Sequence, residues 1–163
     1  MKTRVNKAVH NIILRDYEHL KMLRKAIEMI LEVDMEKPQI SVLGKLGNNH
    51  VAHGKKDLAQ ELELNAFWNK VFKKEVNFGV FHHTEFGTLF IVGALASQFL
   101  FDISGRPLGS MSAGPYGILR GLGITEDKVN FYLKALKKGH LILLVRHTLP
   151  QIQLIEEKLD KLS

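Results

Sequence analysis

The stretch AVHNIILRDYEHLKMLRKAIEMILEVDMEKPQISVLGKL, residues 8–46, decides the fold class. Residues 8–14 are rich in isoleucine and valine, which predicts a strand, and we expect it to be a central strand of the same sheet as residues 140–146. Asp16 stands where a helix N-cap belongs, and apolar residues then recur at helical spacing to about residue 33. A second strand is expected over residues 39–46. Together these segments form a βαβ unit, whose two strands are expected to be parallel and in one sheet.

The same order of elements returns nearer the C-terminus. Residues 88–95 read as a buried strand, Thr125 opens an amphipathic helix, and residues 140–146 contain a continuous apolar run expected of a central strand. Two βαβ units in succession predict an α+β fold, the ferredoxin-like duplicated βαβ sandwich with both crossover helices on one face of the sheet. An irregular α+β fold is the alternative.

The length of 163 residues fits a single domain. Within it we expect a helical insertion, with its helix over residues 57–74, and a C-terminal amphipathic helix over residues 151–162. The expected organisation is a βαβ unit (1–46), the insertion (47–85), a glycine-rich segment with the second βαβ unit (86–149) and the C-terminal helix (150–163).

The composition excludes several classes of function. The chain has no cysteine, which excludes disulfides, thiolate metal sites and a cysteine nucleophile and fits a reducing compartment. No secretory signal pattern is visible, so a cytoplasmic location is expected. The net charge is +6, but the lysines are scattered and do not alternate with aromatic residues, so nucleic acid is not an expected partner.

A membrane contact is conceivable only in the glycine-rich middle. Residues 86–101 are uncharged but shorter than a membrane-spanning segment, and Gly109, Ala113, Gly117 and Gly121 recur every four positions. Close packing inside a soluble core is the favoured explanation of that stripe.

Histidine is the one residue type that suggests a site. His50 and His53 share a loop, and His82, His83 and Glu85 lie close together after the inserted helix. Imidazole and carboxylate groups from two loops are a ligand set for zinc, nickel or iron. The sequence therefore offers a metal site of His50, His53, His82, His83 and Glu85, with surface or capping histidines as the alternative.

Three further histidines lie at strand ends. His140 and His147 bracket the last strand, and His10 would meet them if residues 8–14 and 140–146 were neighbours in the sheet. Ordinary packing at the strand edge is favoured over a site.

Three segments of the second half resemble a known family: FGTLFIVGAL from Phe86, GLGITEDKVNFY from Gly121 and LKKGHLILLV from Leu136. With the opening strand–helix–strand they are similar to a family of small bacterial general-stress or low-temperature-induced proteins, whose hallmark is a glycine-rich hydrophobic middle. The resemblance implies a bacterial origin and a role in stress, and it brings no catalytic residues with it.

The sequence does not match the enzyme motifs considered: Gly44-Lys45 lacks the P-loop spacing, and no nucleophile elbow is present. The leading prediction is a non-enzymatic, stress-related protein that acts through protein–protein contacts or self-association and needs no cofactor. The alternatives are a metal-binding protein or small metalloenzyme with a divalent metal, and a peripheral membrane protein.

Assembly follows from the predicted sheet. Its strands are apolar on both faces, whereas a ferredoxin-like sheet carries helices on one face only. Either the two additional helices cover the other face, or a second subunit does. On this ground we expect a homo-oligomer, most simply a dimer.

Overall fold

The computed structural model describes residues 10–33, 36–46 and 55–162. Its elements are β1 (His10–Tyr17), α1 (Leu20–Glu32), β2 (Gln39–Lys45), α2 (Lys55–Phe72), β3 (Phe78–His83), β4 (Gly87–Gly93), α3 (Ala96–Phe99), β5 (Asp102–Ile103), β6 (Arg106–Pro107), the 3-10 turn η1 (Leu108–Ser110), α4 (Gly114–Gly121), α5 (Glu126–Lys137), β7 (Leu141–Thr148) and α6 (Leu149–Leu162). The α+β class, the inserted helix and the C-terminal helix are confirmed.

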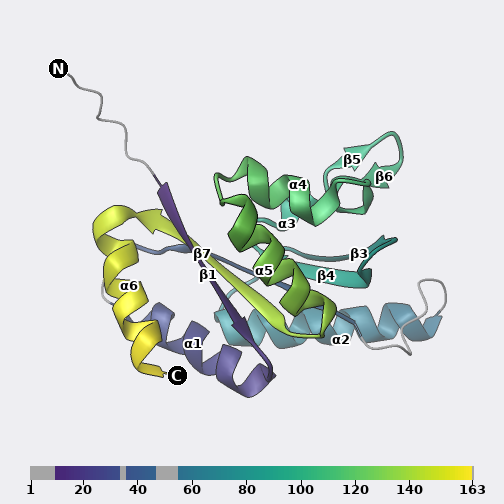
Figure 1. The fold of residues 1–163 in the computed structure, drawn as a ribbon. Coiled ribbons are helices and arrows are strands. Elements are labelled where there is room, and N and C mark those ends of the chain that lie inside the picture. The colour runs from purple at the N-terminus through teal and green to yellow at the C-terminus, as the bar shows by residue number, and fades with distance from the viewer. Residues whose placement is uncertain (1–9, 34–35, 47–54, 163) are drawn as a thin grey trace.

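Five strands form one sheet in the order β1-β7-β2-β4-β3, and every neighbouring pair is antiparallel. β1 and β2 are parallel to each other, as predicted, with β7 between them. The expectation that both β1 and β7 are central is half right. β7 lies inside the sheet, whereas β1 is its edge strand (Figure 1).

The start of α1 differs from the sequence prediction. Asp16 and Tyr17 continue β1, because Tyr17 still pairs with Leu141 of β7. The helix begins three residues beyond Tyr17, after His19, which makes no side-chain capping bond. Asp16 is therefore not an N-cap, since pairing with β7 holds it in the strand.

Each crossover unit, β1–α1–β2 and β4–α5–β7, straddles one antiparallel strand, as in ferredoxin-like sheets. The two helices, however, lie on opposite faces, where α1 packs in one core and α5 in the other. The second unit crosses the sheet in the opposite direction, and its strands point the opposite way. Crossovers of the same hand would therefore place both helices on one face. In this protein the two crossovers have opposite hands.

The sheet consequently separates two hydrophobic cores, and alternate residues of β7 serve each. Ile142 and Leu144 face the core beneath α3, α4 and α5, whereas Leu143 and Val145 face the core beneath α1, α2 and α6. This explains the continuous apolar run in β7. It also answers the question of the second face, because helices of the same chain cover it. An uncovered face is thus no longer a reason to expect a second subunit.

The glycine-rich middle is a packed part of the fold. The stripe of small residues is not one helix, because Gly109 belongs to η1 and α4 begins only at Gly114. A Cβ at Gly109 would lie 2.7 Å from the ring of Phe81, so that glycine allows close packing. Within the described residues, no helix is long and apolar enough to cross a membrane.

Candidate functional site

The predicted metal ligands are only partly within the described structure. His50 and His53 lie outside the described residues. His82 and His83 are neighbours on β3 and therefore face opposite sides of the sheet. His82 is exposed, and its Nδ1 lies 3.4 Å from the hydroxyl of Thr88.

His83 has a structural role. It is only 3% exposed, and its Nδ1 accepts the backbone N–H of Glu85 at 3.1 Å. Its Nε2 lies 3.3 Å from the carbonyl of Ser112, so this nitrogen carries the proton. The carboxylate of Glu85 turns instead to Lys137, at 3.2 Å. Among the described side chains, no three of His, Asp and Glu gather as a metal would require. The full five-residue site stays a prediction.

β1 and β7 are neighbours, so the strand-end histidines can be placed. The Nδ1 of His140 lies 2.8 Å from a carboxylate oxygen of Asp16. His147 is buried, with its Nε2 2.7 Å from the carbonyl of Glu36. These two histidines sit near opposite ends of β7 and have separate partners. His10 pairs in the ladder with Thr148, and its side chain lies outside the described part.

The more informative feature is the outer edge of β1, which pairs with no other strand among the described residues and is called the free edge below. On β2, the Ile40 carbonyl accepts a hydrogen bond from Ala94, and the Leu46 N–H donates to Thr88, so even-numbered residues of β2 bond towards β4. Odd-numbered residues of β2 therefore bond to β7.

The register carries this alternation across the sheet. Ser41 of β2 is opposite Leu144 of β7, and Leu144 is opposite Leu14 of β1. Even-numbered residues of β7 thus bond to β2 and odd-numbered ones to β1. In β1, residues 11, 13, 15 and 17 bond to β7, while residues 10, 12, 14 and 16 present their N–H and C=O groups outward.

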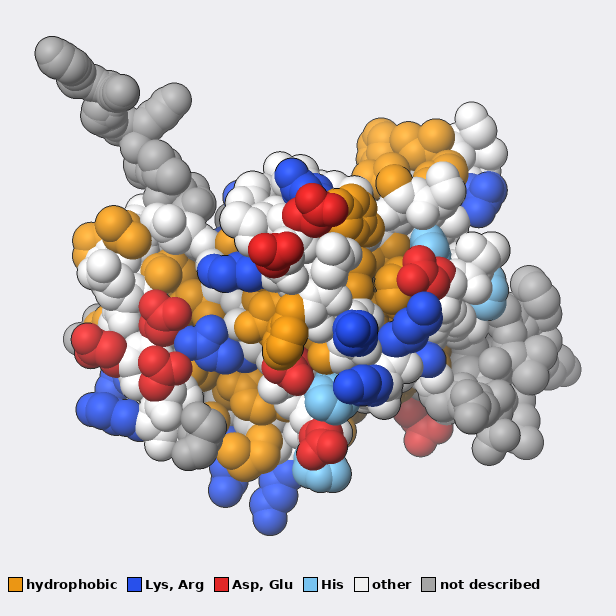
Figure 2. Space-filling view, viewed as in Figure 1, with side chains coloured by type: hydrophobic (Ala, Val, Ile, Leu, Met, Phe, Trp, Pro, Cys, Tyr) orange, Lys and Arg blue, Asp and Glu red, His pale blue; other side chains and the backbone are white. Residues whose placement is uncertain are grey.

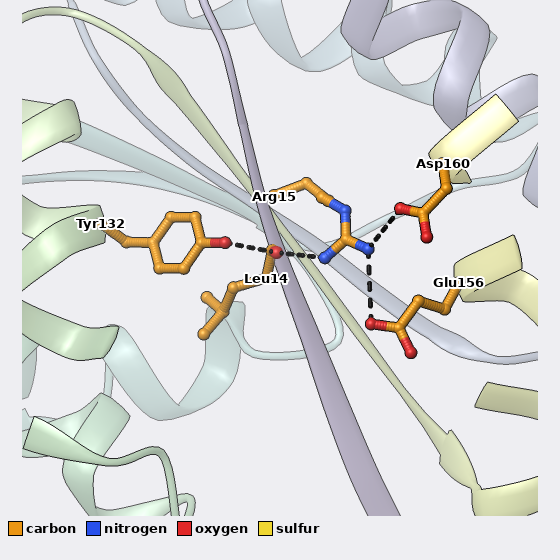
Figure 3. Close-up of polar contacts among 5 residues, drawn as sticks. All are labelled: Leu14, Arg15, Tyr132, Glu156 and Asp160. Atoms are coloured by element: carbon orange, nitrogen blue, oxygen red, sulfur yellow. Dashed lines mark hydrogen bonds and ion pairs between the residues drawn. The ribbon is translucent and has the colours of Figure 1, made fainter. Parts of the chain in front are cut away.

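One of these outward groups is satisfied by side chains. The Leu14 carbonyl accepts the hydroxyl of Tyr132 at 2.8 Å and the Nη1 of Arg15 at 2.9 Å (Figure 3). Tyr132 reaches it from α5, on one side of the strand. Two side-chain donors therefore stand where the backbone of a sixth strand would lie.

Arg15 is held from the other side of the strand. Its Nη2 lies 3.1 Å from Asp160 and 3.4 Å from Glu156, one helical turn apart on α6. Burial disfavours the charge of Arg15, but the bonds to Asp160 and Glu156 outweigh it and leave the pKa raised. For Tyr132, burial disfavours the charged phenolate and so raises the pKa, although the nearby Arg15 opposes this rise. Both groups therefore keep their protons, and both remain donors.

A groove of about 600 Å³ follows this edge between α5 and α6. It runs along residues 11–15 and is lined on the α5 side by Ile124, Phe131 and Tyr132 together with the polar Thr125, Asp127 and Lys128. Phe131 is 61% exposed. Glu156 closes the α6 side. Figure 2 shows hydrophobic side chains at the surface between α5 and α6, with acidic side chains over α6.

These groups offer backbone hydrogen bonds along β1, apolar contact with Phe131 on the α5 side and the paired Arg15 and Glu156 on the α6 side. Sequence reasoning missed this site because it placed β1 inside the sheet. Two traces of it are visible in the sequence. Glu156 and Asp160 are spaced i, i+4 on the last helix, and the apolar centre of β1 is followed at once by Arg15.

No family model, curated protein or solved structure matches this chain. The resemblance to the bacterial stress family therefore stays a prediction.

Proposed function

We propose that this is a non-enzymatic protein that acts through protein–protein contacts, and that the free edge of β1 receives an extended strand of the partner. The observation that carries the proposal is the groove along residues 11–15, where outward backbone groups lie beside the exposed ring of Phe131. An added strand bonds through its main chain and is selected through alternate side chains. The stress-related role implied by the resemblance is a separate prediction on which this contact does not depend.

The groove also sets the chemistry of the strand it takes. Side chains of an added strand point alternately to the two faces of the sheet. On the α5 face they would meet the exposed ring of Phe131, which favours apolar residues, with Asp127 and Lys128 beside it. On the α6 face they would meet Arg15 and Glu156, which are already paired with each other, so this face does not require a charged residue. The expected ligand is therefore an extended segment with apolar residues towards α5 and no required charge towards α6.

The test uses a library of random linear peptides selected for binding to the full chain. Ile12→Pro removes an outward N–H without removing a bond to β7, since proline is tolerated on the solvent side of an edge strand. Ile12→Ala is the matched control, because it shortens the same side chain and keeps the N–H. We expect selected peptides to bind Ile12→Pro at least about tenfold more weakly than Ile12→Ala, the equivalent of about 1.4 kcal/mol.

Both variants are first checked for a cooperative thermal transition. Peptides that bind the two variants equally would place the contact elsewhere and overturn the proposal. A selection that returns no linear peptide would overturn it as well.

A further inference from the structure

We propose that the strand received by β1 is β1 of a second copy of this chain. The two strands would pair antiparallel about a two-fold axis that passes between the two copies of Ile13. This rests on the proposed function, because it uses the same free edge and names the partner. The axis would run perpendicular to the sheet and join two five-stranded sheets into one continuous sheet.

Only alternate residues of β1 direct their backbone groups away from β7, and this limits the possible registers of a partner strand. Only outward residues can exchange hydrogen bonds with a partner strand, and those residues are His10, Ile12, Leu14 and Asp16. All four find an outward partner within the strand when Ile12 of one copy lies opposite Leu14 of the other. His10 then lies opposite Asp16, and Ile13 lies opposite its own copy.

The sequence of β1 is self-complementary in this register. Three apolar residues, Ile12 to Leu14, form its centre, and two polar residues flank them on each side. Asn11 falls opposite Arg15, and the acidic Asp16 falls opposite His10. A shift that centres the axis on Leu14 would place Arg15 and Asp16 opposite isoleucines, and one that centres it on Arg15 would oppose two like charges.

The groove walls fit the same symmetry. A two-fold axis perpendicular to the sheet brings α5 of one copy beside α5 of the other. Phe131, exposed beside the groove in the single chain, would then be covered from across the seam. On the opposite face, each Arg15 already pairs with Glu156 and Asp160 of its own α6 and offsets one of these two charges, which reduces the repulsion between the two acidic helices.

The present bonds of Leu14 are compatible with this pairing. Its carbonyl oxygen has two lone pairs, held by the side chains of Tyr132 and Arg15. The Ile12 N–H of the second copy would replace one of them. Within the described residues, the N–H groups of Ile12 and Leu14 make no hydrogen bond, so these two donors are open to a partner strand.

The absence of cysteine makes a register-specific cross-link possible. Two single variants, Asn11→Cys and Arg15→Cys, are prepared separately, mixed and oxidised. Positions 11 and 15 of opposite copies form a non-hydrogen-bonded pair, whose Cα atoms lie about 4.5 Å apart, within the range that a disulfide spans. Two copies of position 11 would lie four residues apart, roughly 13 Å, which is too far. We expect a disulfide-linked dimer from the mixture and from neither variant alone.

Light scattering on the wild-type chain supplies the second measurement. We expect twice the 18.5 kDa mass of one chain at micromolar concentration, and the monomer mass for Ile12→Pro. Adding Ile12→Pro to the Arg15→Cys chain should also abolish the mixed cross-link. Ile12→Ala, which keeps the N–H, should leave it in place.

Failure of this inference is distinguishable from failure of the proposed function. A wild-type chain that stays at 18.5 kDa and gives no mixed cross-link overturns the second copy as partner. The edge as a binding surface would still stand if selected peptides distinguished Ile12→Pro from Ile12→Ala. A cross-link formed by either cysteine variant alone, or a dimer that survives Ile12→Pro, overturns the register.

Discussion

At the scale of single residues, the Leu14 carbonyl determines how the edge behaves. A backbone acceptor in a sheet is normally met by the N–H of a neighbouring strand. Here a phenol and a guanidinium meet it instead, and an N–H group of a partner strand can replace either side-chain donor without a change in the backbone of β1. The carbonyl is thus satisfied in the single chain and is still available to a partner strand.

Tyr132→Phe tests this reading of the carbonyl. Loss of a single hydrogen bond should lower the free energy of unfolding by about 1 kcal/mol, measured by urea denaturation. Self-association should become stronger, by up to roughly fivefold for the same 1 kcal/mol, because the partner no longer displaces the hydroxyl. Tyr17→Phe is the control, since Tyr17 lies on the same strand but bonds to β7 through its backbone. Weaker association in Tyr132→Phe would show that the hydroxyl supports the contact.

The same hydroxyl should make the protein sensitive to alkaline pH. Burial raises the pKa of Tyr132 above the ordinary tyrosine value of about 10. Its contribution to stability is therefore complete below that value and is lost as pH rises through the folded-state pKa. Burial raises the pKa of Tyr17 in the same direction. Urea denaturation at rising pH should show a smaller alkaline loss in Tyr132→Phe than in wild type, and an unchanged slope would contradict the assignment.

Gly93, at the end of β4, is a test of the sheet itself. It has a φ of 104°, and an added Cβ would lie 2.1 Å from the Ile40 carbonyl oxygen of β2. Gly87, at the other end of β4, has a φ of 83° but open space around it. Gly87→Ala should cost about 1–2 kcal/mol from backbone strain alone. Gly93→Ala should cost clearly more, measured by thermal denaturation, and equal costs would contradict the close approach of β2 and β4.

At the scale of elements, local periodicity predicted most of what was found. The helical spacing in α1 and α5 and the apolar run in β7 are properties of short segments, and each element appeared close to its expected place. The position of β1 was not predictable in the same way. Ile12, Ile13 and Leu14 look like a central strand because helices cover both faces of the sheet there.

The candidate site was harder to predict for a related reason. A free strand edge depends on which strands pair, and β1 pairs with β7, which lies more than 120 residues later in the chain. The histidines drew attention because their chemistry is visible in any context. In the fold, His83 and His147 are buried, and each is bonded through both ring nitrogens to nearby groups.

The helix α6 should contribute to stability through one face only. Ile155 is fully buried in the core shared with α1 and α2, whereas its neighbour Leu154 is 41% exposed. Ile155→Ala should lower the free energy of unfolding by about 2–5 kcal/mol. Leu154→Ala should change it by less than about 0.5 kcal/mol, in the same denaturation experiment. Similar losses from both would mean that α6 packs differently from the structure.

At the scale of the whole molecule, association is directed to the ends of the sheet. Helices cover both faces of the sheet, and among the described strands its two ends are β1 and β3, so a further strand would be added beside one of these. Pairing of β1 with β1 is symmetric and closes at two copies, whereas pairing of β1 with β3 of another copy would continue into an open filament. The two-fold arrangement therefore predicts a dimer that does not grow with concentration.

Amide hydrogen exchange should reveal both the edge and its partner in one experiment. In dilute solution, odd-numbered amides of β1, such as Ile13 and Arg15, should exchange slowly because they bond to β7, while Ile12 and Leu14 should exchange fast. As concentration rises, pairing with a second copy should slow Ile12 and Leu14 and leave the amides within β7 unchanged. Slow exchange of all β1 amides in dilute solution would show that another part of the chain covers the edge. Fast exchange of Ile12 and Leu14 at every concentration would show that no second copy binds there.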